Sequence, residues 1–143
     1  CEIAKKEMGE EAQRLTELRD KLIAKVLKIP NSHLIGPSLE FRASPSKKRL
    51  PNIVNFWFSF VEGESLVIQL DLKGMAVSTG SACSSMKLEP SYVLIATGLK
   101  PEQAHSSLRI SLGRQTKESD LDYLVGNLSQ IIKKLREISP YGK

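Results

Sequence analysis

Apolar residues recur at helical spacing near both ends of this chain, and that periodicity constrains the fold more than any other feature. In the segment that runs to Lys28, the apolar positions are Leu15, Leu18, Leu22, Ile23, Val26 and Leu27. Near the other end they are Leu121, Leu124, Val125, Leu128, Ile131, Ile132 and Leu135. Thr116 is the predicted cap of this second helix, with Glu118 and Asp120 in its first turn. We therefore expect a long amphipathic helix at each end of the domain.

Signals for short strands and helices alternate between these two segments. The run 53–61 is β-branched and aromatic, which predicts a strand buried on both faces. A helix is expected over 63–72 and a brief strand over 75–77. A further helix opens at Pro90 and stops at Gly98.

The residues from Leu108 to Leu112 alternate between apolar and polar, as a half-buried strand does. The stretch from Pro37 to Pro51 is polar and has no periodicity, so we interpret it as a loop. The expected order is α, β, α, β, α, β, α. This order predicts an α/β fold class of the α+β type, in which helices cover a small antiparallel or mixed sheet.

Length, composition and charge limit the classes of protein to consider. The 143 residues make one ordinary domain, and 41% hydrophobic with 26% charged residues is typical of a globular protein. We find no apolar run long enough to cross a bilayer, so no membrane association is expected. Two cysteines without a CxxC motif predict neither a disulfide framework nor a zinc site, and they favour the reducing cytoplasm.

The net charge of +5 raises the possibility of RNA binding, which needs clustered basic residues and exposed aromatic residues on a sheet face. Lysines and arginines are instead spread along the chain, with Ser46-Lys47-Lys48-Arg49 as the one cluster. We interpret the charge as a solvated basic face and expect no nucleic-acid partner.

A single thiol, Cys83, lies in the run Ser78-Thr79-Gly80-Ser81-Ala82-Cys83-Ser84-Ser85, where the residues are small and uncharged. Glycine gives the backbone freedom, the small neighbours leave the sulfur unhindered, and the nearby cation Lys87 favours the thiolate. Most lone cysteines are small core residues, but a core cysteine should have apolar neighbours. We predict that residues 78–87 form a mobile loop with Cys83 as a nucleophile.

Several motifs in one order resemble the C-terminal part of the pyridoxal-phosphate-dependent cysteine desulfurases, class-V aminotransferases that supply sulfur for iron–sulfur clusters. The matching runs are Leu18-Arg19-Asp20, Arg49-Leu50-Pro51-Asn52, Val61-Glu62-Gly63-Glu64-Ser65-Leu66, Gly80-Ser81-Ala82-Cys83, Leu88-Glu89-Pro90-Ser91-Tyr92-Val93-Leu94 and Ala104-His105-Ser106-Ser107-Leu108-Arg109-Ile110-Ser111-Leu112-Gly113-Arg114. The loop is similar to that of the family branch with a long, mobile catalytic segment. Small departures are Thr79, where serine is common, and Ile35, where asparagine often precedes the glycine.

The resemblance implies roles for two residues of this chain. Cys83 matches the thiolate that attacks the sulfur of cofactor-bound L-cysteine, which yields L-alanine and an enzyme persulfide. Arg109 matches the arginine that grips the substrate α-carboxylate, a task suited to a planar guanidinium that offers two parallel hydrogen bonds. On the residues alone, Arg109 would be interpreted as an exposed strand residue in an ion pair.

No run of the sequence resembles the lysine that binds the cofactor or the residues that flank its ring. The resemblance therefore implies that residues 1–143 are the single small C-terminal domain, with the large domain that binds pyridoxal phosphate absent from this chain. The start at Cys1, in what reads as the middle of a helix, leads us to expect a part of a longer protein, although a separately encoded piece stays possible. We expect the chain by itself to be inactive.

The resemblance also implies L-cysteine as substrate, an iron–sulfur scaffold protein and other sulfur acceptors as partners, and a homodimer for the complete enzyme. The alternative is a stand-alone sulfur-carrier or docking module that receives a persulfide from another enzyme. We interpret His33 and His105 as hydrogen-bonded structural residues and assign no role to Cys1.

Overall fold

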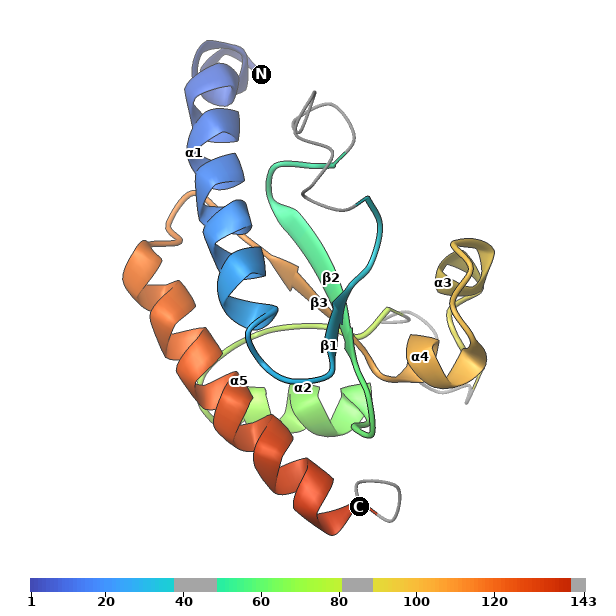
Figure 1. The fold of residues 1–143 in the computed structure, drawn as a ribbon. Coiled ribbons are helices and arrows are strands. Elements are labelled where there is room, and N and C mark those ends of the chain that lie inside the picture. The colour runs from blue at the N-terminus through green and yellow to red at the C-terminus, as the bar shows by residue number, and fades with distance from the viewer. Residues whose placement is uncertain (38–48, 81–88, 140–143) are drawn as a thin grey trace.

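The computed structural model describes residues 1–37, 49–80 and 89–139 of the chain (Figure 1). In chain order, its elements are α1 (Glu2–Val26), β1 (Ser32–Leu34), β2 (Ile53–Phe58), α2 (Gly63–Asp71), α3 (Tyr92–Ala96), α4 (Pro101–His105), β3 (Ser107–Ser111) and α5 (Glu118–Ile138). The two long terminal helices and the strands near residues 53 and 108 are confirmed. Among the described residues the expected strict alternation is not seen, because no helix lies between β1 and β2 and no named strand lies between α2 and α3.

The three strands form an antiparallel sheet in the order β1-β2-β3, which confirms the predicted fold class. Both strand pairings are antiparallel. Trp57 of β2 lies opposite His33 of β1 and opposite Ser107 of β3. The segment 75–77 does not form the predicted strand; Ser78 instead makes an isolated bridge with Arg109 at the free edge of β3.

Side chains of β2 alternate between the two faces of the sheet, as strand geometry requires. Val54, Phe56 and Phe58 are buried, whereas Ile53, Asn55 and Trp57 are half-buried. The prediction of burial on both faces is thus wrong for the second face. The predicted strand also ends early, at Phe58, because Phe60 adopts a φ of 65° and is exposed.

Helices α1, α2 and α5 pack against the first face of the sheet and enclose the main core (Figure 1). The core members with no exposed surface are Leu22, Ile23, Val26, Val54, Phe56, Phe58, Leu66, Leu70, Leu108 and Leu128. Full burial of each large apolar side chain contributes about 1.5–3 kcal/mol, so this layer supplies most of the driving force for folding. The apolar faces predicted for the two long helices both pack into this core, except for Leu27, which follows the end of α1 and is exposed.

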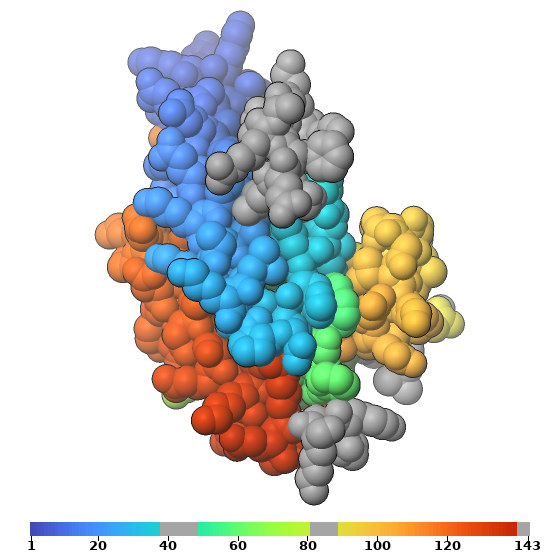
Figure 2. Space-filling model, in the orientation of Figure 1, coloured from blue at the N-terminus to red at the C-terminus, as the bar shows by residue number. Residues whose placement is uncertain are grey.

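A smaller apolar cluster forms on the second face of the sheet, where α3 and α4 pack. Its buried members are Ile35, Leu94 and Ala104, and Trp57 packs against them. In Figure 2 the residues of α3 and α4 stand out from the side of the molecule as a separate lobe. The second face is therefore covered at its Trp57 end by short helices rather than by a full layer.

Two predicted helix starts need correction. The cap of α5 is Lys117 rather than Thr116, because the Thr116 hydroxyl accepts a hydrogen bond from the Gly113 N–H at 2.9 Å and so closes the turn after β3. The Asp120 carboxylate accepts the Lys117 N–H at 2.9 Å, which fits the predicted acidic first turn. Pro90 precedes the α3 cap instead of lying in its first turn. None of the helices in the described ranges combines the length and hydropathy that a membrane span requires.

Gly63 lies where the start of α2 meets the entry to β3. A Cβ atom at this buried glycine would stand 2.5 Å from the Ser107 carbonyl oxygen and 2.8 Å from the His105 carbonyl oxygen. Both obstacles are backbone atoms, so neither can rotate away. The close approach of helix and strand therefore requires glycine at this position.

We expect Gly63→Ala to lower the free energy of unfolding by about 1–3 kcal/mol, the usual cost of forcing an atom into a packed site. Gly126 is the matched control, because it lies in α5 and a Cβ there would meet nothing within 4 Å. Gly126→Ala should raise stability by about 0.5–1 kcal/mol, since alanine favours the helix. Urea unfolding followed by circular dichroism measures both changes. Equal effects of the two substitutions would contradict the packing argument.

Candidate functional site

Of the two predicted site residues, the structure describes Arg109. Cys83, together with Lys87 and the greater part of the predicted loop at 78–87, lies outside the described residues. Arg109 occupies the middle of β3, between the buried residues Leu108 and Ile110. Because those two neighbours belong to the main core, the Arg109 side chain belongs to the opposite face of the sheet.

The half-buried guanidinium of Arg109 has an unusual set of contacts. Its Nη2 atom donates to the Ser78 hydroxyl at 3.4 Å, and this is its one hydrogen bond within the described part of the chain. No ion pair to a described carboxylate is formed by Arg109. A guanidinium has five N–H donors in a fixed planar fork, and here one of them is used on a neutral hydroxyl. The Arg109 guanidinium can therefore bind an anion.

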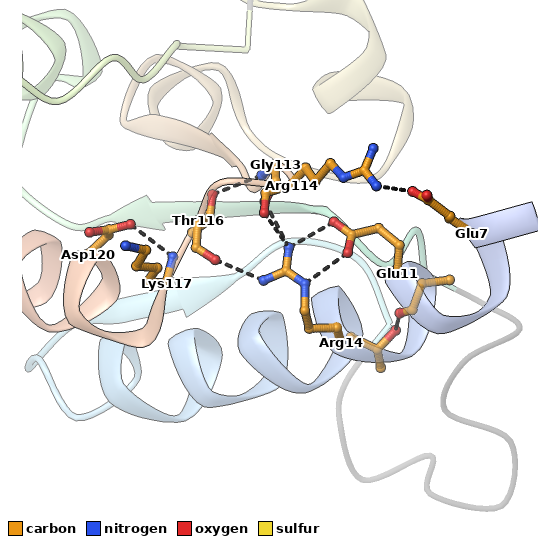
Figure 3. Close-up of polar contacts among 10 residues, drawn as sticks. Glu7, Glu11, Arg14, Gly113, Arg114, Thr116, Lys117 and Asp120 are labelled. Carbon is orange, nitrogen blue, oxygen red and sulfur yellow. Dashed lines mark hydrogen bonds and ion pairs between the residues drawn. The ribbon is translucent and has the colours of Figure 1, made fainter. Parts of the chain in front are cut away.

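Other arginines of the described ranges use their donors to hold the fold together. Figure 3 shows Arg14 on α1 between Glu11 and the loop that follows β3. Its guanidinium donates to both Glu11 oxygens at 2.8 Å and to the carbonyl oxygens of Gly113, Arg114 and Thr116 at 2.9–3.1 Å. Hydrogen bonding from Arg14 lowers the pKa of the Glu11 carboxyl below its ordinary value, which favours the charged pair. Arg14 thus ties α1 to the turn between β3 and α5.

Arg19 and Arg49 secure the chain at either side of the segment 38–48. Arg19, which is 1% exposed, donates to the Leu50 carbonyl oxygen at 2.7 Å and pairs with Asp20 at 2.8 Å. Arg49 donates to the Ile35 carbonyl oxygen at 3.1 Å. Burial, with a smaller effect of the nearby Arg19 charge, lowers the pKa of Arg49. The first two motifs of the resemblance are therefore structural in this domain.

Arg136 completes this structural set near the other end of the sheet. It donates from α5 to the carbonyl oxygens of Pro30, Asn31 and Ser59 at 2.8–3.2 Å. Arg114 forms an ion pair with Glu7 (Figure 3). Arg109 is thus the arginine in the described ranges whose side chain contacts neither a carboxylate nor a backbone carbonyl.

The chain that leads toward Cys83 passes the edge of β3 that does not pair with β2. Ser78 and Arg109 exchange two backbone hydrogen bonds, at 3.1 and 2.6 Å. Two residues on, the Gly80 N–H donates to the Ser107 hydroxyl at 3.3 Å. That buried hydroxyl donates in turn to the Ala104 carbonyl oxygen at 2.7 Å. The start of the predicted loop is therefore attached to the strand that carries Arg109.

The two histidines and Cys1 take the following places. His33 stacks on Trp57 with ring centroids 3.8 Å apart, and its Nε2 lies 3.3 Å from the Ser59 hydroxyl, which confirms a structural role. His105 is exposed and makes no side-chain hydrogen bond within the described ranges, so its predicted structural role stays a prediction. Cys1 is exposed.

Neither a metal nor a covalently held cofactor finds a site among the described residues. They contain no cluster of three His, Cys, Asp or Glu side chains suited to a metal ion. A lysine that binds a cofactor lies in a pocket that desolvates its amine. In the described ranges every lysine is exposed except Lys25, and Lys25 pairs with Glu118 and Asp122. These residues do not fit the site of pyridoxal phosphate.

Asn55 is the neighbour of Arg109 that the sequence did not single out. The two residues face each other directly across β2 and β3. A polar amide inside an otherwise aromatic and β-branched strand was the available signal, but its partner follows only from the strand register.

Comparison with known proteins shows which family this chain is similar to. Residues 2–124 match the family model described as aminotransferase class-V. The chain is 51% identical over 140 residues to a protein named cysteine desulfurase IscS 1 from Archaeoglobus fulgidus, which covers 98% of this chain and 35% of that protein. It is 51% identical over 141 residues to cysteine desulfurase IscS from Dictyoglomus turgidum, at 98% and 34% coverage.

Solved structures agree with the fold. A NifS-like protein superposes with a TM-score of 0.75 at 28% sequence identity, over 93% of this chain and 31% of the other. This chain spans about a third of the length of the curated relatives that it matches.

Proposed function

The chain belongs to the class-V aminotransferase family, and on that premise we propose that it is the C-terminal domain of a cysteine desulfurase. In this proposal residues 1–143 form one small domain that contributes a nucleophile, Cys83, and a substrate-binding residue, Arg109. The observation that carries the proposal is the half-buried Arg109, whose guanidinium contacts no carboxylate among the described residues and which lies beside the chain that leads to Cys83. Two proteins named cysteine desulfurase that are 51% identical to it support the same conclusion.

Arg109 suits the binding of a substrate carboxylate. A half-buried guanidinium that has no acidic partner within the described ranges gains charge-assisted hydrogen bonds when a carboxylate arrives, and such bonds are roughly twice as strong as neutral ones. The antiparallel bridge to Ser78 and the register with β2 fix the backbone on both sides of Arg109. Its side chain is therefore held on a rigid element, which gives the carboxylate a defined position.

Cys83 suits the acceptance of sulfur. Gly80 is attached to Ser107, and the three residues from Gly80 to Cys83 span at most about 11 Å when fully extended. Its thiolate would attack the sulfur of L-cysteine, so that one S–S bond forms, the substrate C–S bond breaks, and a proton takes the place of sulfur on the carbon. The net reaction is L-cysteine plus the Cys83 thiol to L-alanine plus the Cys83 persulfide.

Pyridoxal phosphate, when bound, supplies the electron sink that C–S cleavage requires. We propose that a part of the complete protein outside this chain binds the cofactor, and this proposal is supported by the described lysines, which do not fit a covalent site for it. We also propose that the complete protein is a cytoplasmic homodimer and passes its sulfur to an iron–sulfur scaffold and to other acceptors.

The experiment uses the complete protein that contains this domain, purified with its cofactor and incubated with L-cysteine. We expect L-alanine to form and the peptide that contains Cys83 to gain the mass of one sulfur atom, as measured by mass spectrometry. The chain of 143 residues alone should produce neither alanine nor sulfide. No alanine from the complete protein, together with sulfur gained at Cys83 only when another desulfurase is added, would favour a sulfur carrier instead.

A further inference from the structure

Asn55 and Arg109 form a directly opposed pair in the antiparallel ladder of β2 and β3. The backbone N–H and C=O of Arg109 are both used on Ser78, at the edge of the strand away from β2. The carbonyl of Asn55 likewise points toward the other neighbour, since it accepts the Ile35 N–H at 2.9 Å. The pair is therefore of the type without mutual hydrogen bonds, in which opposed side chains approach each other most closely.

Both side chains of this pair lie on the second face of the sheet. Val54 and Phe56, on either side of Asn55, are fully buried in the main core, and so is Leu108 next to Arg109. Asn55 is half-buried and its amide makes no side-chain hydrogen bond within the described ranges. A half-buried amide with two unused donors thus lies beside a guanidinium with unused donors.

We propose that Asn55 and Arg109 together bind the substrate carboxylate. This inference rests on the proposed function and adds a second residue to its substrate site. The Asn55 side-chain N–H donates to one carboxylate oxygen, while the Arg109 guanidinium donates two parallel hydrogen bonds to the same group. The adjacent pair of Trp57 and Ser107 cannot replace it, because Trp57 is covered by His33 and the α3–α4 cluster.

The test measures steady-state kinetics of the complete enzyme with L-cysteine for Asn55→Ala. A hydrogen bond to a carboxylate is present in the ground state and the transition state alike, so its loss should raise KM about tenfold or more with little change in kcat. Ser111→Ala is the matched control, because Ser111 is exposed on β3, the strand of Arg109, and belongs to the next pair on the same face, opposite Ile53. This control should leave KM unchanged.

A second variant separates carboxylate binding from a structural role. Asn55→Asp keeps the shape of the side chain but replaces the donors with a charge that pairs with Arg109 and repels the substrate. We expect Asn55→Asp to raise KM more than Asn55→Ala does, with the cofactor absorbance retained. A milder effect of the isosteric variant, or a KM for Asn55→Ala equal to that of the parent enzyme, would overturn the inference. A parent enzyme that makes no alanine would instead refute the proposed function.

Discussion

Replacing Cys83 with serine in the complete protein is expected to reduce sulfur transfer from L-cysteine by roughly a thousandfold or more, because it removes the proposed nucleophile. Serine is nearly isosteric but stays un-ionised near neutral pH, so it cannot attack the substrate sulfur. Cofactor binding should persist, since we assign the cofactor site to a different part of the protein. Alanine formation in single turnovers and the visible absorbance of the cofactor measure the two properties separately.

Cys1→Ser provides the matched control for this substitution. Cys1 is exposed, and the proposed function gives it no role. It is also the other cysteine of the chain, so its replacement tests whether any thiol or only Cys83 is required. We expect unchanged transfer in this variant. Full turnover after Cys83→Ser would remove Cys83 from the proposed mechanism, whatever the control shows.

Periodicity was sufficient to predict the two long helices, because their apolar residues serve one large core. Leu22 and Leu128 are examples, since each has no exposed surface and each was assigned to its core face from spacing alone. The strand around Arg109 is predictable from the sequence in the same way, because Leu108 and Ile110 alternate with polar neighbours. In these segments local pattern and tertiary packing specify the same structure.

Features that depend on long-range contacts were not predictable. Burial on both faces was expected for β2, but the second face is only partly covered, and sequence alone does not show which helices pack there. The segment at 75–77 has a strand composition yet forms no strand, and the isolated bridge with Arg109 is made by the next residue, Ser78. Thr116 has the chemistry of a helix cap, but its hydroxyl is used by the turn after β3. In each case a tertiary contact overrides a local preference.

The same distinction between local pattern and long-range contact applies to the candidate site. Arg109 is identified by its resemblance to a family motif, whereas its lack of contact with the described carboxylates is a property of the folded chain. Arg14 and Arg19 have the same side chain, but carbonyl oxygens and acids occupy their donors. Sequence cannot distinguish an arginine with free donors from one whose donors are satisfied. Asn55 was missed for a similar reason, because only the strand register places it opposite Arg109.

Arg109→Lys is expected to lower kcat/KM for L-cysteine in the complete enzyme by roughly 10- to 150-fold. Lysine keeps the positive charge but loses the planar fork, so at least one charge-assisted hydrogen bond to the carboxylate is lost, which costs about 1.5–3 kcal/mol. The change should fall mainly on KM, because the carboxylate does not react. Steady-state kinetics over a range of L-cysteine concentrations measure it.

Arg114→Lys is the control for Arg109→Lys, because Arg114 lies five residues further along and is exposed in an ion pair with Glu7 (Figure 3). Exposed ion pairs contribute little to stability, so this variant should retain the kinetics of the parent enzyme. If Arg109→Lys retained the kinetics of the parent enzyme as the control does, positive charge alone rather than the Arg109 fork would attract the substrate, which would contradict the proposal. A loss confined to Arg109→Lys requires a specific contact, because the two variants carry the same net charge and differ only in the place where the fork is removed.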